Sequence, residues 1–147
     1  MTTNYKVTNE GAGSNLQLTF EVDATANQDF TLADLDNGLC AAVLTGDNKV
    51  GMGAAGGRLL GKVIKVSEEM QTGTAIPALC TVQVTGVARF KYAATTPAVG
   101  NKVEVDGAGK VRQACTLTDV PAGGTKHRGI VLAVITADTT CDVLLDA

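Results

Sequence analysis

The sequence predicts an all-β protein, a small antiparallel β-barrel or sandwich with an N-terminal arm. Between residues 79 and 110, apolar and polar side chains alternate in three short segments separated by glycine or proline. Turn signals recur about every ten residues along the chain, as they do in sandwiches and barrels. No convincing long amphipathic helix interrupts this pattern.

The composition agrees with thin, closely packed β layers. Hydrophobic residues make up 45% of the 147 residues, which excludes a disordered chain and suits one domain with its own core. Val, Ala and Leu supply most of this content, whereas aromatic residues are 3% and Trp is absent. A binding site built from aromatic platforms is therefore not expected.

Residues 15–23 form the cleanest predicted strand. Leu16, Leu18, Phe20 and Val22 fall on one face and polar residues on the other, so one face is expected to be buried. Residues 24–37 are less regular, and their apolar side chains suit either one helical turn or a loop packed on the core. The turn that follows ends at Gly38.

The remaining strands are shorter and are separated by turns. They are expected within residues 39–44, 58–66, 79–85, 87–92, 99–105, 111–115, 130–135 and 141–145. We divide the chain into residues 1–38, an N-terminal arm or added β segment, and residues 39–147, the β-barrel or sandwich domain.

Charge, hydropathy and cysteine usage limit the partners and the compartment. The net charge is −3 and no basic run of four residues occurs, so nucleic acid and anionic membranes are not expected partners. The N-terminus lacks an apolar signal core and no apolar run reaches membrane-spanning length, which predicts synthesis in the reducing cytoplasm. The four cysteines are widely spaced and are expected to be small buried apolar residues rather than zinc ligands.

No motif for catalysis stands out, so we predict no enzyme activity, no cofactor and no metal. Residues 51–56 match GxGxxG, but the β-branched segment that follows is not the helix a dinucleotide site requires. The one histidine, His127, lies between two basic residues and is expected at the surface. The close carboxylates lie in turns or at strand edges.

Two further features leave alternatives open. Arg89 and Lys91 share one face of a strand, which is either a solvated face or a contact face for a large acidic partner. Residues 61–66 and 80–84 also resemble residues 129–134 and 141–145, each pair following a turn with a lysine. This echo indicates either a structural duplication or the general similarity of short hairpins.

Five ordered motifs connect the second part of the chain with a known family. They are Val82-Gln83-Val84-Thr85-Gly86, Gly100-Asn101-Lys102-Val103-Glu104-Val105, Asp106-Gly107-Ala108-Gly109-Lys110-Val111, Arg128-Gly129-Ile130-Val131-Leu132 and Cys141-Asp142-Val143-Leu144-Leu145. In order and spacing they resemble the bacteriophage capsid decoration, or cement, proteins of the small β-barrel type, over about residues 39–147.

The resemblance implies a structural virion protein without catalysis. Such proteins bind the capsid exterior, commonly as homotrimers, and bridge major capsid protein subunits, so many modest contacts give high avidity. Tyr5, Lys6 and Val7 of the N-terminal segment and Gly51, Met52 and Gly53 of the glycine-rich loop are then expected at a capsid or subunit interface, with Arg89 and Lys91 as further candidates. The alternative is a virion-surface β module that binds a host receptor or glycan.

Overall fold

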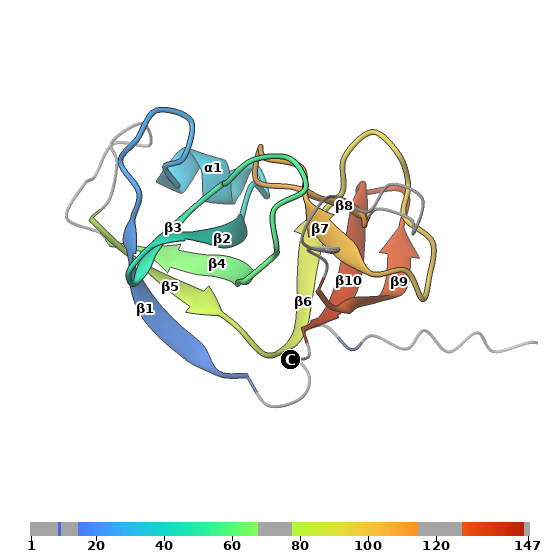
Figure 1. The fold of residues 1–147 in the computed structure, drawn as a ribbon. Coiled ribbons are helices and arrows are strands. Elements are labelled where there is room, and N and C mark those ends of the chain that lie inside the picture. Colours follow the sequence, from blue (N-terminus) through green and yellow to red (C-terminus); the bar gives the residue numbers. More distant parts are fainter. Residues whose placement is uncertain (1–8, 10–14, 68–77, 115–127, 146–147) are drawn as a thin grey trace, which may run out of the picture.

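The computed structural model describes residue 9 and residues 15–67, 78–114 and 128–145. Its first half is a closed five-stranded barrel with the strand order β1-β3-β2-β4-β5 (Figure 1). The strands are β1 (Gln17–Val22), β2 (Ala41–Gly46), β3 (Lys49–Gly51), β4 (Gly61–Val66) and β5 (Leu79–Gln83). The β-barrel predicted from the sequence is therefore confirmed.

The barrel is mixed rather than wholly antiparallel. The hairpin of β2 and β3 places β3 beside β1, and the two run parallel with Glu21 opposite Lys49 and Val22 opposite Val50. The other four neighbouring pairs are antiparallel. The parallel pair needs a longer crossover between β1 and β2, and residues 23–40 provide it.

One short helix, α1 (Leu32–Asp36), lies in this crossover. Thr31 caps it, because its hydroxyl accepts from the Asp34 N–H while the Asp34 carboxylate accepts from the Thr31 N–H. Gly38, at φ +77°, ends it. Of the two structures expected here, the chain adopts the helical turn, and the Phe30 side chain before it is fully buried.

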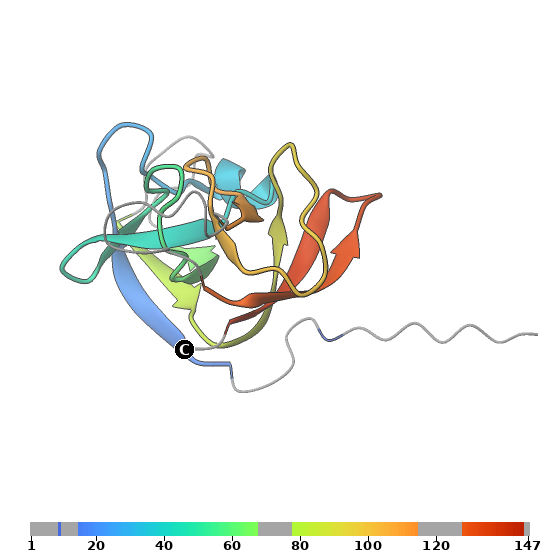
Figure 2. The same ribbon diagram turned by 45° about the vertical axis from the view of Figure 1, so that its right-hand side comes forward.

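The second half contains a three-stranded sheet and a two-stranded one. The order β6-β10-β9 joins β6 (Gly86–Lys91), β9 (Ile130–Ile135) and β10 (Thr140–Leu145), and β7 (Val103–Val105) pairs with β8 (Val111–Gln113). Two single bridges connect the sheets, a parallel one from Tyr92 to Val111 and an antiparallel one from Val103 to Arg128. Figures 1 and 2 show this half beside the barrel.

The strand pairing of the first half recurs in the second. With the bridges included, β6-β8-β7-β9-β10 repeats β1-β3-β2-β4-β5, and each pair keeps its parallel or antiparallel sense. The register of β1 with β5 agrees with that of β6 with β10, since Phe20 lies opposite Cys80 and Phe90 lies opposite Cys141.

Single hydrogen bonds are repeated too. The Leu60 N–H donates to the Ala42 carbonyl at 2.7 Å, and the Arg128 N–H donates to the Val103 carbonyl at 2.9 Å. Three further N–H to carbonyl bonds of the first half have a counterpart in the second half. The bond from Asp23 to Val50 corresponds to that from Ala93 to Val111, and the bond from Val22 to Ala78 corresponds to that from Tyr92 to Thr139. The bond from Val63 to Cys40 corresponds to that from Val131 to Asn101. The echo seen in the sequence thus corresponds to one pairing pattern used twice.

The two-faced pattern predicted for residues 15–23 is right for half of the strand. Phe20 and Val22 are buried, but Leu16 and Leu18 are 49% and 42% exposed, so the prediction that they are buried is wrong. The reason is that β1 pairs with β3 only at Glu21 and Val22, which leaves its first residues at an open end of the barrel. Residues 1–8 and 10–14 lie outside the described residues, whereas β1 itself belongs to the barrel.

A close backbone approach occurs where each half begins its last hairpin. A Cβ atom built on Gly61, the first residue of β4, would lie 2.0 Å from the Gln83 carbonyl oxygen. A Cβ on Gly129, before β9, would lie 2.8 Å from the Leu144 carbonyl oxygen. Both positions therefore require glycine, since real Cβ atoms do not come this close to backbone.

We expect Gly61→Ala to lower the free energy of unfolding by about 2–3 kcal/mol, because the backbone of β5 must shift to admit the methyl group. Urea unfolding followed by circular dichroism measures this. Gly46→Ala is the control, because a Cβ there meets only the Lys49 side chain at ordinary contact distances. Equal stabilities of the two variants would contradict the assignment.

Candidate functional site

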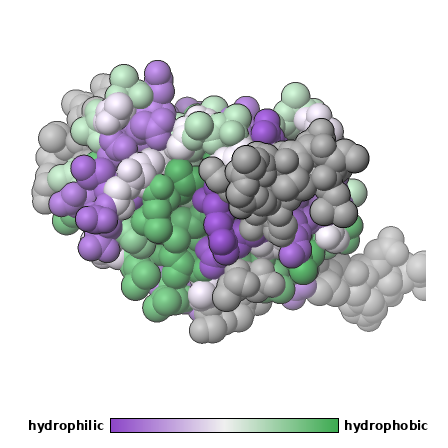
Figure 3. All heavy atoms as spheres, in the orientation of Figure 1, coloured by the Kyte–Doolittle hydropathy of each residue, from purple (hydrophilic) through white to green (hydrophobic). Residues whose placement is uncertain are grey.

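An apolar groove lies at the open end of the barrel. Its volume is about 660 Å³, within the range of ordinary ligand and docking pockets. Its lining is Leu18, Val43, Leu44, Gly57, Arg58, Leu59, Leu60, Val84, Thr85 and Arg128. Figure 3 shows a continuous hydrophobic patch on this side of the molecule.

The groove exposes large apolar side chains that a folded domain would normally bury. Leu44 is 57% exposed, Leu18 is 42% exposed, and Leu16 beside Leu18 is 49% exposed. Single exposed leucines are common on protein surfaces, but a contiguous group around a hollow marks a contact site.

Arg128 fixes the polar border of the groove. Its guanidinium donates to the main-chain carbonyls of Leu60 and Val84, which lie before β4 and after β5. Its own N–H donates to the Val103 carbonyl of β7 at 2.9 Å. Arg128 therefore joins the two halves at the groove, whereas Arg58 at the same border is exposed.

The glycine-rich loop predicted at an interface is held by the chain itself. The Gln28 side chain accepts from the Gly53 N–H at 2.7 Å and donates to the Gly53 carbonyl at 3.1 Å. Gly51 and Met52 are buried, and Met52 donates its N–H to the Gln28 carbonyl. Gly51, Met52 and Gly53 do not line the groove, whereas Gly57 of the same loop does, and their place at an interface stays a prediction.

The GxGxxG match has the surroundings of a turn. It begins at the end of β3, turns at Gly53 and Gly56 with positive φ, and leads into β4 rather than into a helix. The pyrophosphate site of a dinucleotide fold needs a helix N-terminus at this point, and the described residues place none there.

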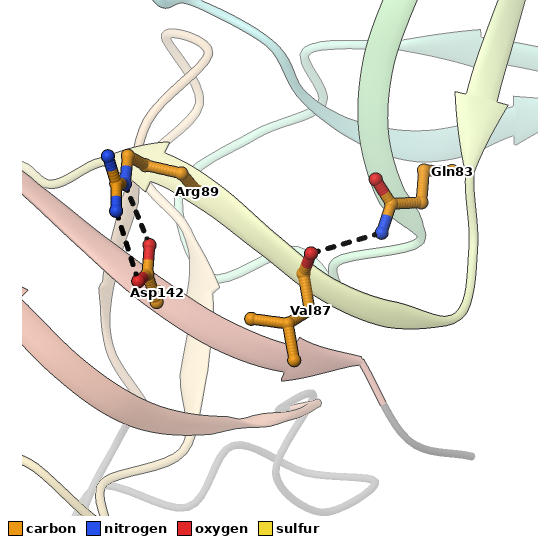
Figure 4. A network of polar contacts seen from close by, with 4 residues as sticks. All are labelled: Gln83, Val87, Arg89 and Asp142. Carbon is orange, nitrogen blue, oxygen red and sulfur yellow. Dashed lines mark hydrogen bonds and ion pairs between the residues drawn. The ribbon is translucent and has the colours of Figure 1, made fainter. Parts of the chain in front are cut away.

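Arg89 is engaged in an ion pair within the sheet. Its Nε and Nη2 atoms donate to the two carboxylate oxygens of Asp142 at 2.8 and 3.2 Å (Figure 4). The two residues lie opposite each other on β6 and β10, and the Asp142 side chain is 6% exposed. This bidentate pair satisfies a buried carboxylate, a structural role that spacing within β6 alone does not reveal.

Figure 4 also shows the Gln83 side chain, which donates to the Val87 carbonyl at the junction of β5 and β6. The Gln83 side chain, which is buried, donates to the carbonyls of Thr85 at 3.0 Å and Val87 at 3.2 Å. The chain turns between these strands at Gly86, which has φ +85°.

Lys91 lies two residues beyond Arg89, on the same face of β6, and is half-buried. The methylene groups of its side chain pass close to Gly38, at the end of α1. With Lys62 and Arg89 it borders a second groove of about 550 Å³ between α1, β4 and β6. Tyr5, Lys6 and Val7, the other predicted contact residues, lie outside the described residues.

A second buried ion pair was not predicted from the sequence either. The Glu104 side chain, 3% exposed, accepts from the Arg112 Nε at 2.8 Å across the β7–β8 hairpin. The signal that was available is the hairpin register, because Val103-Glu104-Val105 and Val111-Arg112 place opposite charges face to face.

The described cysteines are inert thiols. Cys40, Cys80 and Cys141 are free and buried. Burial raises the pKa of Cys80 to about 11 and, together with the neighbouring Asp142 carboxylate, that of Cys141 to about 12. Burial also raises the pKa of Cys40. A reactive cysteine needs a lowered pKa, so these three act as small core residues.

The described residues contain no group of three or more His, Cys, Asp or Glu that could hold a metal ion. His127 and Cys115 lie outside that part of the chain. No described helix is long and apolar enough to cross a membrane. Neither the protein-family models nor the curated proteins compared with this chain match it.

We expect Arg89→Ala to lower the free energy of unfolding by about 2–3 kcal/mol, because it leaves the buried Asp142 carboxylate without its partner. Lys91→Ala on the same strand face is the control and should cost less than about 1 kcal/mol. Urea unfolding of both variants decides between the roles. A stable Arg89→Ala protein would favour a contact role for Arg89 over a structural one.

The reactivity of the thiols at a fixed pH tests whether they are buried. At pH 8 about one Cys80 thiol in a thousand is ionised if its pKa is about 11, so this thiol should scarcely react with a disulfide reagent in the folded protein. The Cys115→Ser variant removes the thiol outside the described residues. Its other three thiols should react with the reagent only after denaturation. Rapid reaction of the folded variant would show an accessible thiol.

Proposed function

We propose that the protein is a bacteriophage capsid decoration protein that binds the outer surface of the shell and bridges major capsid protein subunits. The observation that carries the proposal is an exposed apolar groove, a surface for protein contact of the kind that a bridging homo-oligomer needs. Two buried carboxylates of the described residues are paired within the sheets. Arg89 and Asp142, and Glu104 and Arg112, form cross-strand pairs. Such a surface suits protein contact better than chemistry.

The sequence motifs behind the family resemblance add support through their physical role. Gly86, Gly107, Gly109 and Gly129 all have positive φ. A Cβ on Gly107 would lie 2.8 Å from the Ala55 nitrogen, and one on Gly109 would lie 2.8 Å from the Leu39 Cβ. Gly86, Gly107 and Gly109 lie where the two halves meet, and Gly129 lies against Leu144 within the second half. A family that shares the ordered set is therefore expected to share this architecture.

We propose that the protein is made in the bacterial cytoplasm and is then located on the exterior of the virion. Each copy contributes modest contacts with the major capsid protein, and a homotrimer contributes them simultaneously, which raises the overall affinity without stronger individual contacts. The absence of basic runs agrees with a position on the outside of the shell, away from packaged DNA.

Co-sedimentation with purified mature capsids of the phage that carries the gene tests the proposal. We expect saturable binding to expanded shells and a higher temperature of capsid rupture when the protein is bound. Unassembled major capsid protein is the control. Binding to a host receptor or a glycan array, with no binding to expanded shells, would instead favour the alternative virion-surface module.

A further inference from the structure

The repeated pairing pattern allows the two halves to be compared face by face. Leu44 lies opposite Val50 in the β2–β3 hairpin, and Val105 lies opposite Val111 in the β7–β8 hairpin. Leu44 and Val105 therefore occupy the same position in the two halves. By the same registers, Leu18 of β1 corresponds to Ala88 of β6.

In the second half this face is covered by the first half. The Gly56 N–H donates to the Val105 carbonyl at 2.9 Å, and the Val105 N–H donates to the Gly57 carbonyl at 3.1 Å. The loop of the first half thus adds to the free edge of β7 as a short extra strand. Val105 is completely buried and Ala88 is 2% exposed.

In the first half the same face is open. Leu44 is 57% exposed and Leu18 is 42% exposed. In the part of the chain that the structure describes, no loop segment bonds the Leu44 main chain as Gly56 and Gly57 bond Val105. The described residues therefore cover one copy of this face and leave the other copy as the apolar groove.

We propose that a second copy of this chain covers the groove. Within one chain, the first half covers the face of the second half. The same contact repeated between chains places the second half of one copy against the open face of the first half of the next. Strand addition at the Leu44 edge and burial of Leu18 and Leu44 would stabilise it.

This contact is head-to-tail, so it joins unlike surfaces of identical chains. Such contacts build a closed ring when the rotation between copies closes, and a filament when it does not. A ring alternates contacts within and between chains, and a ring of three copies has six similar halves. The groove is then the subunit contact of the proposed trimer, and the capsid contact lies elsewhere on the surface.

The test is the molar mass of the full-length protein, measured by size-exclusion chromatography with light scattering. We expect the wild type at a multiple of the 15.0 kDa chain mass, three under the proposed trimer. Leu44→Glu places a charge in the groove and should weaken association at least about thirtyfold, as loss of a central interface residue does. Its circular dichroism spectrum and melting of the monomer should show an intact fold.

Val99→Glu is the matched control, because Val99 is 65% exposed and does not line the groove. It should associate as the wild type does. A monomeric wild type, or a Leu44→Glu protein that associates like the wild type, would overturn the proposal.

Capsid co-sedimentation of the same proteins separates this inference from the proposed function. Oligomers that Leu44→Glu dissociates but that never bind capsids would refute the decoration role and keep the subunit contact. A monomeric wild type whose capsid binding is lost in Leu44→Glu would assign the groove to the capsid and overturn the subunit contact. A monomer that binds capsids equally well with and without Leu44→Glu would overturn the subunit contact too, because the groove would then bind neither a second copy nor the capsid.

Discussion

The close passage of two backbones at the start of each last hairpin is the constraint on which the structure depends. At Gly61 the chain must pair with β2 on one side and β5 on the other, and the Gln83 carbonyl occupies the space that a side chain would need. Gly129 meets the Leu144 carbonyl in the same way. At both places one backbone occupies the space that a side chain would need, so the close pairing of the strands depends on glycine there.

The composition agrees with this close pairing of the strands. Valine and alanine fill the interior of each half, and the few large side chains stand at repeated places, Phe20 and Phe90 opposite the cysteines of β5 and β10. The three described cysteines serve here as small buried apolar residues with raised pKa values.

How far the sequence predicts the fold depends on the range of the interactions. Period-two alternation located most strands, and the glycine punctuation located the turns, because both are local properties of the backbone. The parallel pairing of β1 with β3 was not predicted, since it joins segments separated by a crossover. The exposure of Leu16 and Leu18 was missed for the same reason, because a pattern within one strand cannot report where its neighbour ends.

The candidate site shows the same limit more sharply. Arg89 and Lys91 look alike in the sequence, yet only the cross-strand register places Asp142 opposite the first of them. The groove was not predicted, because its lining comes from five separate segments and its openness appears only when the two halves are compared. A duplicated unit whose two copies have different surroundings exposes in one copy what the other buries. Sequence similarity between the halves alone therefore cannot identify such a contact surface. The unequal burial of Leu44 and Val105, which occupy the same position, is the observation on which our proposal rests.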